Sequence, residues 1–384
     1  MDFDHTQDEE DFNDHVRQVI KNRINPHHSE WRKGMTTPHS FFKILGEEGL
    51  LGFRFEDDMV VPIPWLMNMH YYKQMAQYSG GLAIASFAST QVGIQALHYY
   101  GTPGQKEAYL YPGIRGERIF SFANTEPGAG SDASAIETSA VDMGDHYLVN
   151  GAKAYITNGD IADHIVLTAV THPDEEKNYR GISMFIVDGN TPGLTRSRLK
   201  KLGWKLSHLS MLRFNDVKVP KENLIGEEKR GFYQTMNVFN TSRIGISALA
   251  LGTAIGAYRL AYRNALDRKV FGKSLLEHES KRNEFADNLA ILHAGWLLAQ
   301  KAAFLKDQGR EFRYNSAMAK LFCTEEGLKI ARWANETFGA RGVIESLPIT
   351  QFTLDAKAAT LGEGAPEVQK KIVAGHIEEL LDEL

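Results

Sequence analysis

The chain has 384 residues, of which 43% are hydrophobic and 24% are charged, and its formal net charge at pH 7 is -5. This balance is ordinary for a globular protein, and the mild negative charge argues against a nucleic-acid partner, which would need clustered Lys and Arg. The single cysteine, Cys323, excludes an internal disulfide and a multi-cysteine metal site, so no metal is expected and a reducing, cytoplasmic location is the simplest. The acidic start and the lack of an apolar run of about 18 residues predict neither a leader nor a membrane span.

The sequence changes character twice along the chain, which at this length predicts two or three packed units in an α+β fold. Residues 1–120 are predicted to be helical, with a helix break near Ser79–Gly81. Residues 121–231 contain short β-rich runs, and the pair Asn150–Gly151 between HYLV and AKAYIT predicts a hairpin turn. Residues 232–384 return to long helices. One predicted core stripe in these helices consists of Phe285, Leu289, Leu292, Trp296, Ala299 and Ala303.

The segment LGEGAPEVQ near the end of the chain places one carboxylate, Glu363, between Gly362 and Gly364. Pro366 fits the first position of a helix, and an acidic group before it would gain about 0.3–1 kcal/mol from the helix dipole. Glycine on both sides would also let the backbone bend and a large ligand approach the carboxylate closely. From these residues alone, helix capping and a functional role both stay open.

Four segments occur in order at the boundaries between the helical and β-rich regions: TEPGAGSD (Thr125–Asp132), GAKAYITNG (Gly151–Gly159), DRKVFGKSLLEHES (Asp267–Ser280) and GEGAPEVQ. Together they resemble the acyl-CoA dehydrogenase family of FAD-dependent oxidoreductases. The resemblance spans essentially the whole chain. By contrast, GAGSDA fits a loose dinucleotide pattern without the strand and helix of a βαβ unit, so an NAD site is rejected.

The resemblance implies three domains and a set of partners. An N-terminal helical domain over residues 1–120 would precede a middle, barrel-like β-sheet domain over 121–231, which contacts the flavin and the thioester. A C-terminal four-helix domain over 232–384 would carry the catalytic glutamate. The expected cofactor is FAD, the expected assembly is a homotetramer or a dimer, and the expected metabolism is that of fatty acids and lipids. Electrons would pass to an electron-transferring flavoprotein.

The resemblance also implies which residues hold the ligands. Ser131, Asn240, Arg243 and Gly364 map to the segments that contact the acyl-CoA substrate. Arg268 maps to an arginine that reaches the FAD pyrophosphate of a neighbouring subunit, a contact that suits a guanidinium fork. The full cofactor-binding set is Phe122, Asn124, Thr125, Ser131, Tyr155, Ile156, Thr157, Arg268, Phe271, His278, Glu336, Phe338, Gly339, Ala340, Ala365 and Glu367.

By the same resemblance, Glu363 is the catalytic base. It would remove the α-proton of the acyl thioester while the β-hydride passes to flavin N5, which gives a 2-enoyl-CoA. Burial beside an apolar acyl chain would raise the pKa of this carboxyl towards the working pH. A second position at which some members carry the base is Ser242 here, and serine alone cannot take that role.

This sequence departs from the family pattern around the base, where Gly362 replaces the usual tyrosine and Ala365 the usual threonine. The room gained beside Gly362 favours a branched or cyclic neutral acyl group. Ala83 replaces the arginine with which glutaryl-CoA enzymes bind a second carboxylate, so a dicarboxylic substrate is not expected. Two alternatives stay open: an enoyl-thioester reductase or acyl-carrier-protein dehydrogenase on the same fold, and a flavin- or CoA-binding protein without turnover.

Overall fold

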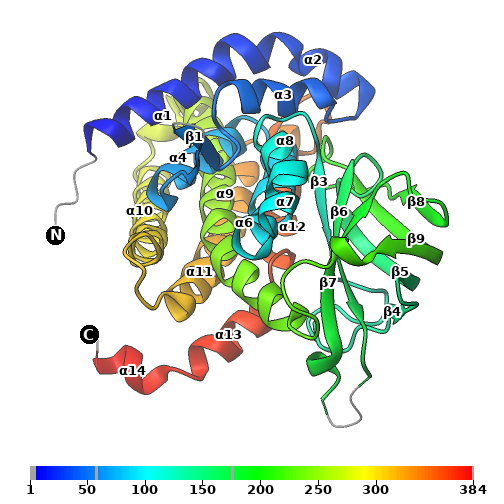
Figure 1. Cartoon of the computed structure of the whole chain (residues 1–384). Coiled ribbons are helices and arrows are strands. Elements are labelled where there is room, and N and C mark those ends of the chain that lie inside the picture. The colour runs from blue at the N-terminus through cyan, green and yellow to red at the C-terminus, as the bar shows by residue number, and fades with distance from the viewer. Residues whose placement is uncertain (1–5, 57–58, 174–176, 383–384) are drawn as a thin grey trace.

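The computed structural model describes residues 6–56, 59–173 and 177–382, so the first five residues of the acidic start lie outside the described part. Helices from both ends of the chain pack together, and the sheet formed by the middle of the sequence stands at one side of them (Figure 1). The fold is therefore α+β, with an N-terminal helical part, a curled middle sheet and a helical C-terminal part, as the sequence predicts.

The N-terminal part wraps its apolar side chains around a core that continues into the C-terminal helices. The predicted break between two helices is confirmed, because Ser79 adopts an extended backbone and its side chain accepts a hydrogen bond from the Leu82 N–H. The elements are α1 (Gln7–Val19), η1 (Ile20–Ile24), α2 (Asn25–Gly34), α3 (His39–Glu47), β1 (Phe53–Glu56), β2 (Met59–Pro62), α4 (Trp65–Tyr78), α5 (Gly80–Phe87), η2 (Ala88–Ile94), α6 (Gln95–Tyr100), α7 (Pro103–Gln105), η3 (Lys106–Leu110) and α8 (Tyr111–Ile114).

The middle sheet has the strand order β3-β6-β4-β5-β9-β8, with β7 also paired to β6. Strands β3 and β4 run parallel to β6, and the other pairs are antiparallel. Its core is a separate cluster of apolar side chains between the strands. The strands are β3 (Phe120–Ala123), β4 (Ser139–Asp142), β5 (His146–Thr157), β6 (His164–Val170), β7 (Ile182–Asp188), β8 (Leu194–Arg198) and β9 (Leu209–Pro220).

The predicted hairpin turn at Asn150–Gly151 is wrong. These residues lie inside the single twelve-residue strand β5, at a shift of its register with β9. Gly151 has φ +147°, and a β-carbon there would lie 2.6 Å from Thr138 Oγ1. The glycine therefore allows a close approach of Thr138 to the strand, which is a second common reason for glycine in a strand.

The C-terminal part is built around α9, which packs against α4, α10, α11 and α12. Helix α9 contains an 18-residue window with a mean hydropathy of 1.4, so the expectation that no such apolar run exists was wrong. Of that window, 78% is buried inside the protein, as in a core helix. The elements are α9 (Gly231–Asp267), β10 (Lys269–Val270), β11 (Lys273–Ser274), α10 (Glu279–Asp307), α11 (Arg313–Glu336), α12 (Ile349–Leu361), α13 (Pro366–Ala374) and α14 (Ile377–Asp382).

The core stripe predicted on α10 is only partly correct. Phe285, Leu292 and the two alanines of the stripe are buried, whereas Leu289 is 44% exposed. Trp296 is half-buried and carries the Lys73 ammonium 3.6 Å from its ring centroid. Cys323 on α11 is fully buried, as expected of a small hydrophobic residue.

Candidate active site

The segment between α12 and α13 makes a sharp turn around Glu363. Glu363 and Gly364 both have a positive φ, +56° and +93°, a conformation that a non-glycine residue adopts only under constraint. Pro366 begins α13 as predicted, but the residue that caps this helix is Ala365, which provides no side-chain hydrogen bond. The Glu363 side chain instead accepts a hydrogen bond from Ser242 Oγ on α9. The capping interpretation of Glu363 is therefore not supported.

The Glu363 carboxylate lies among groups that oppose each other in their effect on its charge. Burial raises the pKa of Glu363, and the hydrogen bond from Ser242 and the positive charges of Arg243 and Lys320 act in the other direction. Arg243 is 4% exposed and donates to Asn240 Oδ1 at 2.6 Å. Burial lowers the pKa of Arg243 to about 10. The predicted base and two predicted substrate contacts thus belong to one cluster at the first half of α9.

Two buried side chains that the sequence analysis did not single out hold the backbone of this turn. Lys320 Nζ, on α11, donates to the carbonyl oxygens of Thr360 at 2.9 Å and Gly364 at 2.6 Å. Gln369 Nε2, on α13, donates to the carbonyl oxygens of Glu363 and Gly364, both at 3.0 Å. Burial lowers the pKa of Lys320 to about 8, although the nearby carboxylate of Glu363 acts against this shift. Lys320 and Gln369 are both 0% exposed, so the turn is held from the protein interior.

Removing the Lys320 ammonium is expected to destabilise the protein. Lys320→Met removes the Lys320 donor from the Thr360 carbonyl and leaves the Gly364 carbonyl with the Gln369 amide alone, which should lower the free energy of unfolding by about 1–3 kcal/mol. Urea denaturation followed by circular dichroism measures this. Lys329→Met is the matched control on the same helix, because its ammonium is exposed and pairs with Glu326 at the surface. This variant should stay within about 0.5 kcal/mol of the original protein. Equal losses in the two variants would contradict the role given to Lys320.

A second group of predicted residues lies at the edge of the middle sheet. Tyr155 has φ +59° and is 63% exposed, at a register shift of β5 between Lys153 and Ile156. The strand contacts the TEPGAGSD loop through a 2.8 Å hydrogen bond from the Ala154 N–H to the Thr125 carbonyl. Ile156 is 3% exposed and packs into the sheet core, so only its backbone is available to a ligand. The bulge therefore turns the Tyr155 ring outward next to the loop.

Phe122 in β3 and Asn124, directly after this strand, connect this edge to α9 and to the sheet. The Phe122 ring meets Phe239 of α9 edge-on, with the ring centroids 5.6 Å apart. Asn124 is 5% exposed and its Oδ1 accepts from Thr168 Oγ1 at 2.8 Å. Phe122 thus contacts the residue that directly precedes the segment Asn240–Arg243, and Asn124 is held by the sheet.

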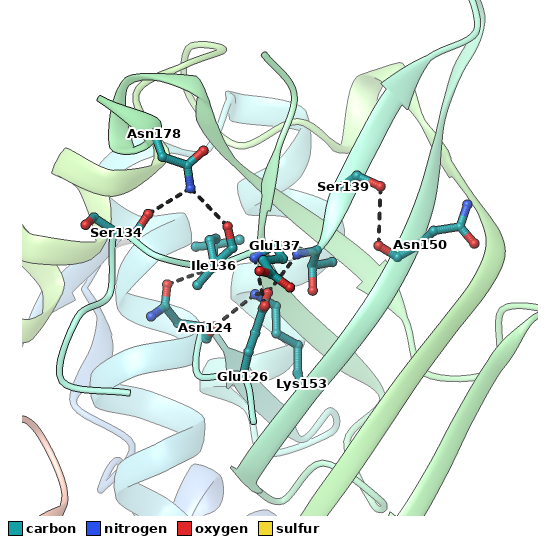
Figure 2. Close-up of polar contacts among 11 residues, drawn as sticks. Asn124, Glu126, Ser134, Ile136, Glu137, Ser139, Asn150, Lys153 and Asn178 are labelled. Atoms are coloured by element: carbon teal, nitrogen blue, oxygen red, sulfur yellow. Dashed lines mark hydrogen bonds and ion pairs between the residues drawn. The ribbon is translucent and has the colours of Figure 1, made fainter. Parts of the chain in front are cut away.

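A buried ion pair anchors the TEPGAGSD loop to the sheet (Figure 2). Lys153 is 0% exposed, and its Nζ donates to Glu126 Oε1 at 2.8 Å and to the Asn124 carbonyl at 2.9 Å. The Glu126 carboxylate also accepts from the backbone N–H groups of Glu137 and Thr138 at 2.8 and 2.9 Å. Burial alone would raise the pKa of Glu126, but Lys153 and these donors hold it below its usual value. Burial lowers the pKa of Lys153 to about 8.

A third group lies where α9 ends against the end of α11. Arg268 donates through one nitrogen to the Phe338 carbonyl at 2.7 Å, and Gly339 has φ +58° beside its guanidinium. A cavity of about 250 Å³ is lined here by Arg268, Glu336 and Gly339 among others. The neighbouring β10–β11 hairpin carries Phe271, which is 94% exposed, and is tied to His278 by a 3.0 Å hydrogen bond to the Val270 carbonyl.

The remaining predicted ligand-binding residues are more open. Ser131, Ala340 and Glu367 are exposed, and Thr125, Thr157, Gly364 and Ala365 are half-buried. The predicted residues thus form three groups, around Glu363, around Tyr155 and around Arg268. Lys320 was missed because nothing near it in sequence marks it, whereas Gln369 lies in the GEGAPEVQ segment, where no pattern indicates that its amide binds the turn. The only available signal for Lys320 is a charged residue on the small-residue face of a helix, in SAMAKLFC.

Three family models match consecutive parts of the chain: the N-terminal domain of acyl-CoA dehydrogenases over residues 6–117, the middle domain over 121–217 and the C-terminal domain over 229–378. The chain belongs to the acyl-CoA dehydrogenase family. A short-chain-specific acyl-CoA dehydrogenase of Clostridium acetobutylicum is 34% identical to this acyl-CoA dehydrogenase over 379 residues, which cover 98% of this chain and 100% of the relative.

Solved structures agree with this assignment. A chain from the structure of an electron-transferring flavoprotein of Acidaminococcus fermentans is 31% identical, with a TM-score of 0.93, and the match covers 98% of this chain and 99% of that one. A glutaryl-CoA dehydrogenase of Mycobacterium smegmatis in complex with FADH2 is 25% identical, with a TM-score of 0.89, and the match covers 97% of this chain and 95% of that one. This acyl-CoA dehydrogenase is thus an oxidoreductase of the flavoprotein class, with FAD as cofactor.

The residues around Tyr155 suit a flavin. Thr125 and Thr157 are half-buried and Ser131 is exposed, so their hydroxyl groups are accessible to polar atoms of a ligand. The Tyr155 ring projects from the same strand edge and offers an aromatic surface. These residues therefore fit the FAD that the family requires.

Proposed function

We propose that this acyl-CoA dehydrogenase oxidises an acyl-CoA thioester to the 2-enoyl-CoA, with Glu363 as the base. The observation that carries the proposal is the position of the Glu363 carboxylate. It is held at a left-handed turn between two glycines, and its hydrogen bond is to Ser242 instead of the adjacent helix. Its raised pKa suits a group that must accept a proton near neutral pH.

In the proposed reaction Glu363 removes the pro-R α-proton and the electron pair of that C–H bond forms the new double bond. Bound FAD supplies the acceptor for the hydride that leaves the β-carbon. The Glu363 backbone N–H makes no hydrogen bond within the described residues, so it can donate to the thioester oxygen as charge develops there. Gly364 adds no side chain beside this oxygen. The Lys320 and Gln369 contacts keep the turn in the geometry that these steps need.

The other ligand contacts are assigned from the three groups of residues. Asn240 and Arg243 would contact the acyl-CoA beside the base, and Ser131 would lie where flavin and thioester meet. Arg268, together with the groups lining its cavity, would hold the pyrophosphate of FAD from a neighbouring subunit, which requires a homotetramer or dimer. The likeness to a chain from an electron-transferring flavoprotein structure supports such a flavoprotein as the electron acceptor.

The proposal also concerns which acyl group the enzyme oxidises. The short-chain-specific relative favours a short, neutral acyl chain. The room left by Gly362 supports the second candidate, a branched or cyclic acyl group. Ala83 is buried and apolar, as a neutral chain requires.

An anaerobic spectral titration of the purified enzyme against a panel of acyl-CoA thioesters tests the proposal. A yellow protein that bleaches with an acyl-CoA is the expected result. Bleaching only by an acyl-carrier-protein thioester, or flavin reoxidation by an enoyl-CoA without the forward reaction, would favour the alternative chemistries. A flavin that no thioester reduces would leave a binding protein without turnover.

The Ser242 hydroxyl is expected to set the pH range of the reaction. Glu363 must be ionised to act, so flavin reduction is lost as the pH falls through the pKa of this carboxyl, which burial raises. Ser242→Ala removes a hydrogen bond to the charged form, so the acid limb of the rate profile should move to higher pH. Stopped-flow reduction rates between pH 5.5 and 9 measure the shift, taken as roughly one unit at most because one hydrogen bond is lost. Ser247→Ala, one buried turn further along α9, is the control. If the acid limb of the rate profile lies at the same pH in Ser242→Ala as in the original enzyme, this role of Ser242 is contradicted.

A further inference from the structure

The loop between β8 and β9 places one aromatic ring beside the turn that carries Glu363. Trp204 Cη2 lies 3.8 Å from the point that a β-carbon on Gly362 would occupy. Apart from the chain neighbours of Gly362, no other described atom comes within 4 Å of that point. The side chain that is missing at position 362 thus has the indole of Trp204 as its immediate neighbour.

The position of Trp204 is fixed by two polar side chains that hydrogen-bond to its backbone. Its N–H donates to Asp355 Oδ1 at 2.5 Å, and Asp355, on α12, is 4% exposed. Lys201 Nζ donates to the Trp204 carbonyl and, at 2.8 Å, to Ser207 Oγ. The residue has φ +52°, which a tryptophan adopts only when its surroundings hold it there.

The ring is also confined from the side of α5. A β-carbon on Gly80 would lie 2.6 Å from Asp355 Oδ2 and 3.1 Å from Trp204 Cδ1, so the first turn of α5 packs directly against this loop. Helix α5 contains Ala83 and the small buried residues that follow it. The indole therefore lies between α5 and Gly362, with the first turn of α5 packed against its Cδ1 side.

We propose that Trp204 is a specificity-determining residue that takes the place of the side chain absent at position 362. Its ring closes the acyl site beside the base and limits the substrate to a short, unbranched acyl chain. This inference rests on the proposed function, because it places the acyl group next to Glu363. It also decides between the two candidates for the acyl group, since the room left by Gly362 is bounded by the indole.

Truncation of Trp204 tests the inference in the holoenzyme. The measurement is kcat/KM for butyryl-CoA, isobutyryl-CoA, octanoyl-CoA and cyclohexanecarbonyl-CoA. Trp204→Ala should raise the ratio of the larger substrates to butyryl-CoA by about tenfold or more, the scale on which an apolar pocket discriminates by size. Trp204→Phe keeps a ring at the position and should change these ratios by less than about threefold on the same scale. A Trp204→Ala enzyme that keeps its FAD but leaves the ratios unchanged would overturn the inference.

A substitution at the other side of the contact gives a second, independent test. Gly362 has φ -68°, so a side chain can be added without backbone strain. Gly362→Tyr should lower kcat/KM for butyryl-CoA when Trp204 is present and should be partly rescued in the double variant with Trp204→Ala. An identical loss in both backgrounds would show that the two positions do not share the site. If no thioester in the panel bleaches the unaltered enzyme, the proposed function itself is wrong. The titration of the unaltered enzyme comes before the variants, so the two failures are distinguished.

Discussion

Glu363→Gln is expected to abolish flavin reduction by acyl-CoA while the enzyme keeps its yellow colour and its substrate affinity. The amide has nearly the shape of the carboxylate and can still accept from Ser242, but it cannot take a proton. A positioned general base contributes about 10²–10⁴-fold to a rate, so the reductive half-reaction should slow by at least that range. Anaerobic stopped-flow absorbance of the flavin measures the rate, and the spectral shift on adding acyl-CoA measures binding.

The matched control is Glu10→Gln in α1, an exposed carboxylate in the first helix, which should leave the rate unchanged. Loss of the flavin from Glu363→Gln would make the rate uninformative about the base, so FAD content is measured alongside. A Glu363→Gln enzyme that holds its FAD and bleaches at close to the original rate would exclude Glu363 as the base. The proton would then have to leave by way of another group.

Lys153→Met is expected to be among the most destabilising single substitutions in this acyl-CoA dehydrogenase. It leaves the Glu126 carboxylate buried without its positive partner, for which the usual loss is about 3–5 kcal/mol in the free energy of unfolding. Because Glu126 also holds the backbone of Glu137 and Thr138, the TEPGAGSD loop should loosen and FAD should be retained less well. Urea denaturation of the holoenzyme and FAD absorbance after gel filtration measure the two effects.

Two further variants identify the cause of that loss. Lys218→Met removes an exposed lysine from β9 and should change stability by less than about 0.5 kcal/mol. Adding Glu126→Gln to Lys153→Met removes the unpaired buried charge, so the double variant should be more stable than Lys153→Met alone. A Lys153→Met enzyme within about 1 kcal/mol of the original would contradict the role given to this pair.

Short sequence motifs predicted more of the fold and of the cofactor than local secondary-structure propensity did. Four short segments in order led to the family, and with it to FAD and to the α–β–α order of the chain. The Asn150–Gly151 pair led to a wrong turn, because a close approach by Thr138, thirteen residues away in sequence, also demands glycine there. Leu289 follows the helical period yet is 44% exposed, because periodicity predicts which residues share a helix face but not how far neighbouring elements cover that face.

At the site, the sequence could single out Glu363 but not the residues that hold it. Lys320 reaches the turn from α11, and Trp204 reaches it from the loop before β9, across more than forty residues of chain in each case. Such contacts arise from packing between distant elements and leave no local pattern. The sequence placed Ser242 at a position where some family members carry the base. Only the fold shows that its hydroxyl donates a hydrogen bond to the Glu363 carboxylate.

The environment of Cys323 has a practical consequence for spectroscopy on this enzyme. The thiol is enclosed on α11, its Sγ donates to the Gly295 carbonyl at 3.3 Å, and burial raises its pKa. Thiol-directed dyes react with thiolates that solvent can reach, so the native chain should give almost no background labelling. A cysteine introduced on the surface could therefore carry a fluorophore or spin label at one chosen place, without first replacing the natural one.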